Sequence, residues 1–367
     1  MRLFLRHGQR LPGRLILLPG DPPHLYDRLP YEADEMTCTG MWQEYSLGKS
    51  LRNYYGHLMA DKYRPSQLRV FTGADNRTTA SAQLVLAGFL QPHGDQVWNS
   101  ALPWQPIPTV TLDVMDYMDV TRCPKLLHQN TVTKIFDSFQ NVSKVMENLS
   151  GMKIQNFGTL SQLSDILVNR AQLRDWIPLP EWANQADFLD MIQRAQYMAT
   201  VESTRPFMDQ IGGWHYDRLL AGMENFLDEK TSHKIVIYSG HDYNMIALAM
   251  ALELDVDWHY GPEFGSYLAV ELHRIDDEDH VKVVIQAAPN ATRRELRVAN
   301  CTTATACTFA RFVRLTHRRR VITEEWMNAC REIELAIVLV LTEGLIVMVL
   351  LRRCYKRRCA NELKETV

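Results

Sequence analysis

Three short aliphatic segments, each followed by a small or polar turn and then by a helical pattern, constrain the fold of this chain more than any other feature. They lie at residues 3–5, 68–71 and 234–238. Alternation of strands and helices is typical of an α/β layer. In an open α/β sheet, ligands bind beyond the carboxyl ends of the strands, where helix N-termini offer free N–H groups to anions. Because all three turns carry arginine or histidine, the sequence predicts a site for an anion at this edge.

The pattern around these segments predicts flanking helices and a hairpin. Apolar residues at three-to-four spacing predict helices over residues 40–55, 78–90, 217–227 and 243–252. Two alternating segments, at 267–273 and 281–287, enclose the acidic turn 276–279 and predict an antiparallel hairpin on the flank of the sheet.

A long helical insertion interrupts the α/β pattern. Strand patterns are absent between about residues 121 and 207, where helical stretches follow one another at 134–149, 160–176 and 186–199. The strand-and-turn pattern returns after Gly212-Gly213. We therefore expect an α/β fold in which a mixed sheet flanked by helices, residues 1–120 and 208–331, carries an all-helical cap, residues 121–207.

Charge and cysteine spacing exclude two classes of function. The 40 basic and 43 acidic residues give a formal net charge of -3, so nothing in the overall charge attracts the chain to nucleic acid. The seven cysteines include no C-x-x-C pair and no Cys/His spacing typical of zinc sites, and we expect no metal and no cofactor.

The segment 335–351 predicts a transmembrane helix. Twelve of its 17 residues are Leu, Ile or Val, which at about 0.5 kcal/mol each outweigh the roughly 3 kcal/mol that Glu343 costs at the bilayer centre. A buried amphipathic helix is the alternative, because the run is at the short end of the spanning range. Basic residues at 352–358 would hold the tail, 352–367, in the cytoplasm. The expected topology is a single-pass type I membrane protein, in the lysosome or at the cell surface.

The N-terminus and the glycosylation sequons bear on whether the chain enters the secretory pathway. Only five residues precede Arg6, too few for a secretory signal, so we expect either an upstream start or a form that does not enter the secretory pathway. Five N-x-S/T sequons nevertheless favour a lumenal or extracellular protein. Asn76 adjoins Arg77 and is expected to be unmodified. The expected acceptors are Asn141, Asn148, Asn290 and Asn300.

The first and last of the three turns contain the residues suited to catalysis, including a candidate nucleophile. In the first, His7 stands between Arg6 and Arg10, a cluster suited to a dianion; the two guanidinium groups disfavour protonation of the imidazole, which stays a neutral nucleophile. In the last, His241 and Asp242 end a strand and open a helix. The alternatives are an accidental R-H-G at a strand end and an ordinary helix cap.

The middle turn, residues 72–78, brings Arg77 to the start of a helix, where free amides already favour negative charge. A lone arginine there is usually a solvated surface residue. The conjunction of three arginines, two histidines and one carboxylate at three turns of the same kind outweighs that alternative.

The motif R-H-G-x-R-x-P near the N-terminus, together with a distant H-D after a glycine, resembles the histidine acid phosphatase family. The resemblance covers roughly residues 2 to 331 and includes Asn76-Arg77-Thr78, Gly212-Gly213 and the order of the cysteines at 301, 307 and 330. It implies that His7 is the nucleophile and Asp242 the proton donor. It also implies a phosphate clamp of Arg6, Arg10, Arg77 and His241.

The resemblance further implies disulfides between Cys301 and Cys307 and between Cys123 and Cys330, which leaves Cys38 as an odd and buried thiol. Gln9 and Asn76 depart from the acidic residues frequent at those positions of the family. These departures are expected to alter substrate preference rather than chemistry.

The expected function is therefore that of an acid phosphatase, which hydrolyses phosphate monoesters of small molecules or phosphoproteins through a phosphohistidine. Alternatives are a relative specialised for inositol polyphosphates or lysophospholipids, and an inactive surface interaction protein, which the six filled motif positions disfavour. Expected partners are the membrane and a second copy in a homodimer.

Overall fold

A computed structural model of the chain describes residues 1–60, 62–112, 129–205, 208–256, 258–298, 301 and 306–322. No helix within these ranges is long and apolar enough to cross a membrane. The expected transmembrane segment 335–351, the basic tail, Cys123, Cys330 and Asn300 all lie outside the described residues.

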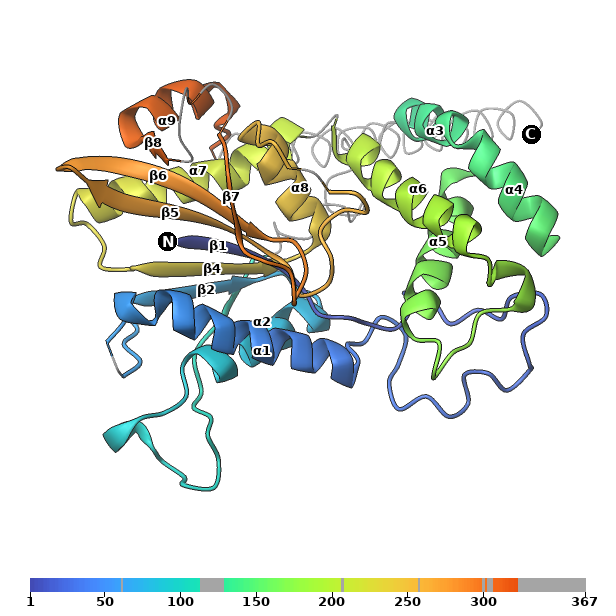
Figure 1. The fold of residues 1–367 in the computed structure, drawn as a ribbon, viewed down its shortest axis with the longest axis horizontal. Coiled ribbons are helices and arrows are strands. Elements are labelled where there is room, and N and C mark those ends of the chain that lie inside the picture. Colours follow the sequence, from blue (N-terminus) through green and yellow to red (C-terminus); the bar gives the residue numbers. More distant parts are fainter. Residues whose placement is uncertain are drawn as a thin grey trace, which may run out of the picture.

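The described residues form a mixed eight-stranded sheet (Figure 1). Its strands are β1 Arg2–Arg6, β2 Leu68–Thr72, β3 Val110–Thr111, β4 Ile235–Gly240, β5 Tyr267–Ile275, β6 Glu278–Gln286, β7 Arg294–Leu296 and β8 Ala306–Thr308. The order is β3-β2-β4-β1-β5-β6-β7, with β8 beside β6. Strands β3, β2, β4 and β1 are parallel, while β5, β6, β7 and β8 pair antiparallel with their neighbours. The three predicted strands are thus β1, β2 and β4, side by side, and the predicted hairpin is β5–β6.

Helices cover both faces of this sheet, because each strand points successive side chains to opposite sides. In β1, Leu3 and Leu5 join the cluster beneath α1 and α2, whereas Phe4 joins the cluster beneath α7 and α8. Figure 1 shows these pairs on opposite sides of the strands. The helix bounds are α1 Cys38–Tyr55, α2 Asn76–Phe89, α7 Met208–Leu227, α8 Asp242–Ala251 and α9 Phe309–Thr316. Short 3-10 turns lie at η1 Gly56–Leu58, η2 Gly94–Gln96, η5 Glu181–Ala183 and η7 His317–Arg319.

The helices of the predicted cap gather to one side of the sheet (Figure 1). They are α3 Gln129–Ser138, α4 Gln140–Ser150, α5 Phe157–Gln172 and α6 Ala186–Thr204. They surround a hydrophobic cluster of their own, which includes Met146, Ile166 and Ile192. Leu18, from the long segment between β1 and α1, joins this cluster. That segment therefore packs with the helices rather than with the sheet, which the domain bounds predicted from the sequence do not anticipate.

Three local expectations are wrong. The single helix predicted over 134–149 is interrupted at Phe139, between α3 and α4. The helix predicted over 217–227 begins at Met208, so Gly212 and Gly213, after which the strand-and-turn pattern is expected to return, lie within α7. A Cβ atom on Gly212 would come 2.2 Å from the Ala247 oxygen, so glycine permits the close approach of α7 and α8. Cys38 is exposed rather than buried.

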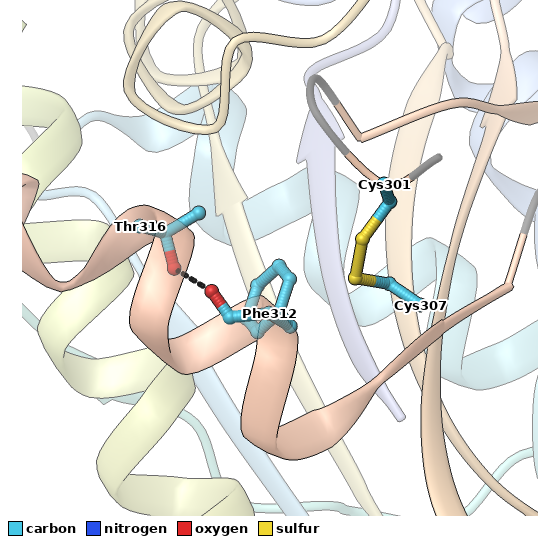
Figure 2. The surroundings of a disulfide bond; sticks show 4 residues. All are labelled: Cys301, Cys307, Phe312 and Thr316. Atoms are coloured by element: carbon cyan, nitrogen blue, oxygen red, sulfur yellow. Dashed lines mark hydrogen bonds between the residues drawn. A yellow bond between two sulfur atoms is a disulfide. The ribbon is translucent and has the colours of Figure 1, made fainter. Parts of the chain in front are cut away.

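A disulfide joins Cys301 to Cys307 at β8, the pairing that the family resemblance implies (Figure 2). Cys307 pairs with Val281 across the β6–β8 ladder, and both cysteines lie in the core cluster on the α7–α8 side of the sheet. In the neighbouring helix α9, the Thr316 hydroxyl donates a hydrogen bond of 2.7 Å to the Phe312 carbonyl. The bridge thus ties β8 to the segment that follows β7.

Candidate active site

The three predicted turns meet at the carboxyl ends of β1, β2 and β4. The strands lie in register, and hydrogen bonds continue past their ends: His7 N–H donates to the Gly240 carbonyl at 3.1 Å, and Gly73 N–H donates to the Ser239 carbonyl at 3.1 Å. These contacts place the loop after β4 between the loops after β1 and β2. The motif residues, far apart in the sequence, therefore form one site.

His7 lies at the centre of this site, 3% exposed. Its Nδ1 atom is 2.9 Å from the Gly8 carbonyl oxygen. Because a carbonyl only accepts, this contact assigns the proton to Nδ1 and leaves the Nε2 lone pair for a substrate. Burial, followed by the positive charge of Arg77, the neighbouring His241, and the charges of Arg6 and Arg10, holds the pKa of His7 well below its usual value of 6.5. The ring is thus a neutral nucleophile even in acidic solution.

Gly8 allows the His7 loop to lie against the start of α1. A Cβ atom at this position would come 2.4 Å from the Gly40 oxygen, a distance that no side chain can tolerate. The Gly8 amide instead donates to the Ser81 hydroxyl of α2 at 3.2 Å. The helix α1 begins beside this contact, where the Thr37 hydroxyl accepts from the Gly40 amide at 3.2 Å. Both helices on this face of the sheet thus fix the loop.

Arg6 is held between the start of α8 and the segment that precedes β5. One guanidinium nitrogen lies 3.0 Å from the Asp242 carboxylate, and another donates to the Pro262 carbonyl. The guanidinium carbon lies 4.1 Å from the centre of the Phe264 ring, a cation–π contact. Burial lowers the pKa of Arg6, and Asp242 opposes that shift, so the group remains charged.

Arg10 is oriented by a carboxylate from the helical layer. Asp165 of α5 contacts it through both oxygens, at 2.7 and 3.4 Å, and also accepts from the Gly13 amide at 2.8 Å. Burial opposes ionisation of Asp165, yet Arg10 and the Gly13 amide hold the pKa of its carboxyl below the usual range. This bidentate ion pair fixes the orientation of the Arg10 guanidinium more firmly than a single contact would.

Arg77 opens α2 and completes the arginine cluster. It pairs with Asp75 at 3.1 Å and with Asp34, which also lies 3.3 Å from Nε of Arg10. Asp34 has a φ of 69°, in the left-handed region that few residues other than glycine adopt. A carboxylate in a strained backbone thus bridges two of the three arginines.

His241 and Asp242 mark the junction of β4 and α8. The His241 ring stands edge-on to His7, with 5.4 Å between ring centres, and its Nε2 atom lies 3.0 Å from Asp75. The His241 amide donates to the Asn244 side-chain oxygen at 2.8 Å, which starts the helix. Asp242, the first residue of α8, has a side chain that is 30% exposed. The side chain of Asp242 is more accessible than that of His241 and reaches the space in front of Arg6.

All six residues predicted for the site are therefore brought together, but their acidic partners are not all apparent in the sequence. Asp75 lies two residues before Arg77 and could have been inferred from that turn. Asp34 comes from an irregular segment, and Asp165 from a helix about 150 residues away, with no local pattern to reveal either. No group of three potential metal ligands occurs among the described residues.

A cavity of about 350 Å³ opens in front of the site, between the sheet and the helical layer. Arg6, Arg10 and Asp242 line its floor, and residues of α5 and α6 line its wall. A larger cavity, about 490 Å³, is lined by Met1, Tyr55, Glu271 and Arg293 and includes none of the predicted site residues. The smaller cavity is the one that brings a ligand to the arginines.

Comparisons with known proteins agree with this arrangement. Residues 18–286 match the model of the histidine phosphatase superfamily, branch 2, a range that includes Arg77, His241 and Asp242 and begins after His7. The chain is 28% identical to the venom acid phosphatase of Apis mellifera over 82% of this chain and 80% of that protein. It is also 28% identical to the prostatic acid phosphatase of Bos taurus, over 89% and 86%, and 25% identical to the lysosomal acid phosphatase of Bos taurus, over 90% and 79%.

Among solved structures, the fold is similar to that of the phytase from Citrobacter braakii, with a TM-score of 0.63 at 16% identity over 87% of this chain and 97% of that one. It is also similar to Hafnia alvei phytase in complex with myo-inositol hexakis sulphate, with a TM-score of 0.64 at 15% identity over 87% and 96%. At these identities the likeness concerns the fold.

Proposed function

This chain belongs to the histidine phosphatase superfamily, branch 2, and on that basis we propose that it is an acid phosphatase that hydrolyses phosphate monoesters through a phosphohistidine on His7. The observation that carries the proposal is a buried imidazole, neutral and with Nε2 available, among three arginines at one edge of the sheet. Three cationic groups suit the dianionic phosphate of a monoester, whose transition-state charge is spread over its equatorial oxygens.

In the first step, Nε2 of His7 attacks phosphorus and the bond between phosphorus and the ester oxygen breaks. The carboxyl of Asp242, which must be protonated at this point, gives its proton to the leaving oxygen. Arg6, Arg10, Arg77 and His241 donate hydrogen bonds to the phosphoryl oxygens. The need for a protonated carboxyl beside a neutral imidazole favours an acidic working pH, which agrees with the depressed pKa of His7.

In the second step, water attacks the phosphohistidine, and the Asp242 carboxylate accepts a proton from that water as the bond from Nε2 to phosphorus breaks. Inorganic phosphate then leaves, and both groups return to their starting protonation states. The pairs that the arginines make with Asp34, Asp75 and Asp165 hold the guanidinium groups in place before the phosphate arrives. Each arginine has five N–H donors, so a carboxylate and a phosphate can share it.

The test is hydrolysis of nitrophenyl phosphate by the full chain and by His7→Ala, with acid quenching to trap a phosphorylated protein. We expect the variant to lose activity by more than about a thousandfold and to trap no phosphate. A matched control is His57→Ala, which removes an exposed histidine outside the site and should change neither result. Equal activity in His7→Ala and the parent chain would overturn the mechanism.

We further propose that the protein occupies a lysosomal or extracellular compartment. Asn141, Asn148 and Asn290 are exposed, as glycan acceptors must be, and the Cys301–Cys307 bridge suits an oxidising compartment. The glycans, including that at Asn300, the bridge from Cys123 to Cys330, the membrane anchor at 335–351 and the homodimer belong to this proposal. Treatment with a glycosidase, followed by electrophoresis with and without reductant, tests the glycans and the bridges. An unchanged mobility would contradict them.

A further inference from the structure

The cavity in front of the proposed clamp joins two different surfaces. Its floor is charged and lies at the carboxyl end of the sheet, where Arg6 ends β1, Arg10 follows in the next loop and Asp242 begins α8. Its wall comes from α5 and α6 and would face the alcohol part of a phosphate monoester whose phosphate is held on the floor. The chemistry of this wall therefore bears on which alcohol the site accepts.

The described part of the lining carries no cation apart from Arg6 and Arg10. Both are engaged by carboxylates, Arg6 by Asp242 and Arg10 by Asp165. The rim adds Glu263, which is exposed and carries the opposite sign. A substrate with several phosphate groups would thus place its additional charges against a wall with no positive partner and beside a carboxylate, which is unfavourable.

Arg194 does not supply the missing positive charge to the cavity. It lies on α6 but outside the cavity lining, and it pairs with Asp190 at 2.9 Å and contacts His259 at 2.7 Å. Its guanidinium carbon lies 5.9 Å from the centre of the Tyr260 ring, and its side chain is about half exposed, at 52%. An exposed and paired cation of this kind contributes little to binding in the cavity.

The wall itself is built of amides and hydroxyls. Its polar, uncharged members are Asn169, Gln172, Gln193, Gln196, Tyr197 and Thr200, and Tyr260 of the segment before β5 adds a hydroxyl beside them. The amide groups of Gln172, Gln193 and Gln196 make no hydrogen bond to another described residue, so they can both donate to and accept from a ligand. Asn169 is 2% exposed and its Oδ1 atom finds no donor within the described ranges.

Val168 and Ile246 add apolar surface beside these groups. A wall that alternates neutral hydrogen-bonding groups with small apolar patches suits a molecule with many hydroxyls and a C–H face, such as a sugar or polyol. A plain alkyl chain would displace water from the half-buried amides of Gln193 and Gln196 without offering them a partner, which is unfavourable.

We propose that the site selects phosphate monoesters of uncharged, hydroxyl-rich alcohols over polyphosphates and over alkyl phosphates. This inference rests on the proposed phosphatase function and adds the substrate class to it. The selection is made by the cap wall, with Gln193 and Gln196 as specificity-determining residues, whereas the clamp treats all monoesters alike.

The test compares kcat/KM of the full chain for glucose 6-phosphate, hexyl phosphate and myo-inositol hexakisphosphate at one acidic pH. Glucose 6-phosphate and hexyl phosphate are both phosphates of a primary alcohol, so their leaving groups differ little and the wall accounts for the difference. We expect glucose 6-phosphate to be preferred to each of the others by at least about tenfold, equal to about 1.4 kcal/mol. Equal or higher values for either competitor would overturn the inference.

A charge placed on the wall tests the cause of the selection. The double variant Q193K/Q196K should shift the preference toward inositol hexakisphosphate by at least about fivefold. The double variant N184K/Q185K adds the same two positive charges at exposed positions outside the cavity and should leave the ratio as it is. An identical shift in the control would show that overall charge, and not the wall, decides.

Nitrophenyl phosphate separates this inference from the function on which it rests. If the chain hydrolyses none of the four compounds, the proposed phosphatase function fails and the inference fails with it. If it hydrolyses nitrophenyl phosphate but prefers the polyphosphate or the alkyl phosphate, the phosphatase function stands and only the substrate class is wrong.

Discussion

The two ends of the sheet both bury charge, but they arrange it in opposite ways. At the amino end of β1, Glu271 of β5 lies at the centre of a far-end cluster, with Tyr55, His273 and Arg293 around it. At the carboxyl end, the centre is the neutral His7, with arginines around it and carboxylates outside them. The far-end cluster thus contains its own anion, whereas the carboxyl end surrounds a nucleophile with cations. The first arrangement stabilises a fold, and the second can bind a phosphate.

The pKa values agree with this difference. Burial opposes ionisation of Glu271, yet hydrogen bonds from His273 and Tyr55 and the charge of Arg293 lower its pKa to about 2. At the other end, burial and the arginines lower the pKa of a base, His7, instead. Substitutions at the carboxyl end should therefore change activity with little effect on stability, and those at the far end should do the reverse.

Among the variants that compare the two ends of the sheet, the largest effect is expected from Asp242→Asn. An amide keeps the shape of the side chain but cannot give a proton to a leaving alkoxide, so kcat/KM for glucose 6-phosphate should fall by about 10² to 10⁴. Nitrophenolate leaves with little protonation, and its ester should be affected much less. Steady-state assays of both esters give the two ratios, and a uniform loss would argue against the donor role.

The sequence could predict this end of the sheet because its signals are local. Each of β1, β2 and β4 is a short aliphatic run that ends in a turn with basic or imidazole groups, and parallel neighbours must bring such turns together. The partner Asp165 could not be predicted. It belongs to α5, about 150 residues from Arg10, and only the packing of the helices on the segment after β1 brings the two together.

The points at which helices break or begin could also not be predicted from the sequence. The apolar spacing over 134–149 continues through Phe139, and nothing in that spacing marks the break between α3 and α4. The sequence pattern places Gly212 and Gly213 where the chain leaves the cap, but both lie within α7, where the approach of α8 requires glycine at position 212. Local patterns thus located the strand ends that form the site, and long-range contacts decided what supports them.

Arg6→Ala sharpens the comparison because it has a counterpart at the far end. Loss of one group that stabilises transition-state charge should lower kcat/KM for nitrophenyl phosphate by about 10² to 10³. Arg293→Ala removes an arginine that is also paired with a carboxylate, yet it should leave kcat/KM within about twofold, since it lies outside the site. If both variants lost activity equally, the distinction between the two ends would fail.

Glu271→Gln should have the converse effect on stability. The amide keeps the size of the side chain but loses the charge that Arg293 and His273 contact, so the free energy of unfolding should fall by about 1–3 kcal/mol near neutral pH. Because the pKa of Glu271 is lowered in the fold to about 2, the stabilisation is present above the pKa of the unfolded chain and is lost as pH falls toward 2. Urea unfolding at several pH values measures it. A deficit that persisted unchanged at low pH would contradict the assignment.

The smallest expected effect is a shift of the acid limb of the pH profile in Arg77→Gln. Protonation of His7 abolishes its nucleophilicity, so activity falls as pH decreases through its lowered pKa. Arg77 is the charge that contributes most to that lowering after burial. Its removal should raise the pKa of His7 and move the acid limb of kcat/KM to higher pH, apart from any general loss of rate. Arg69→Gln removes an exposed arginine of β2, the strand that precedes α2, and should leave the limb in place. A limb that did not move in Arg77→Gln would mean that burial alone keeps His7 neutral, and that the arginines at this end bind phosphate without tuning the nucleophile.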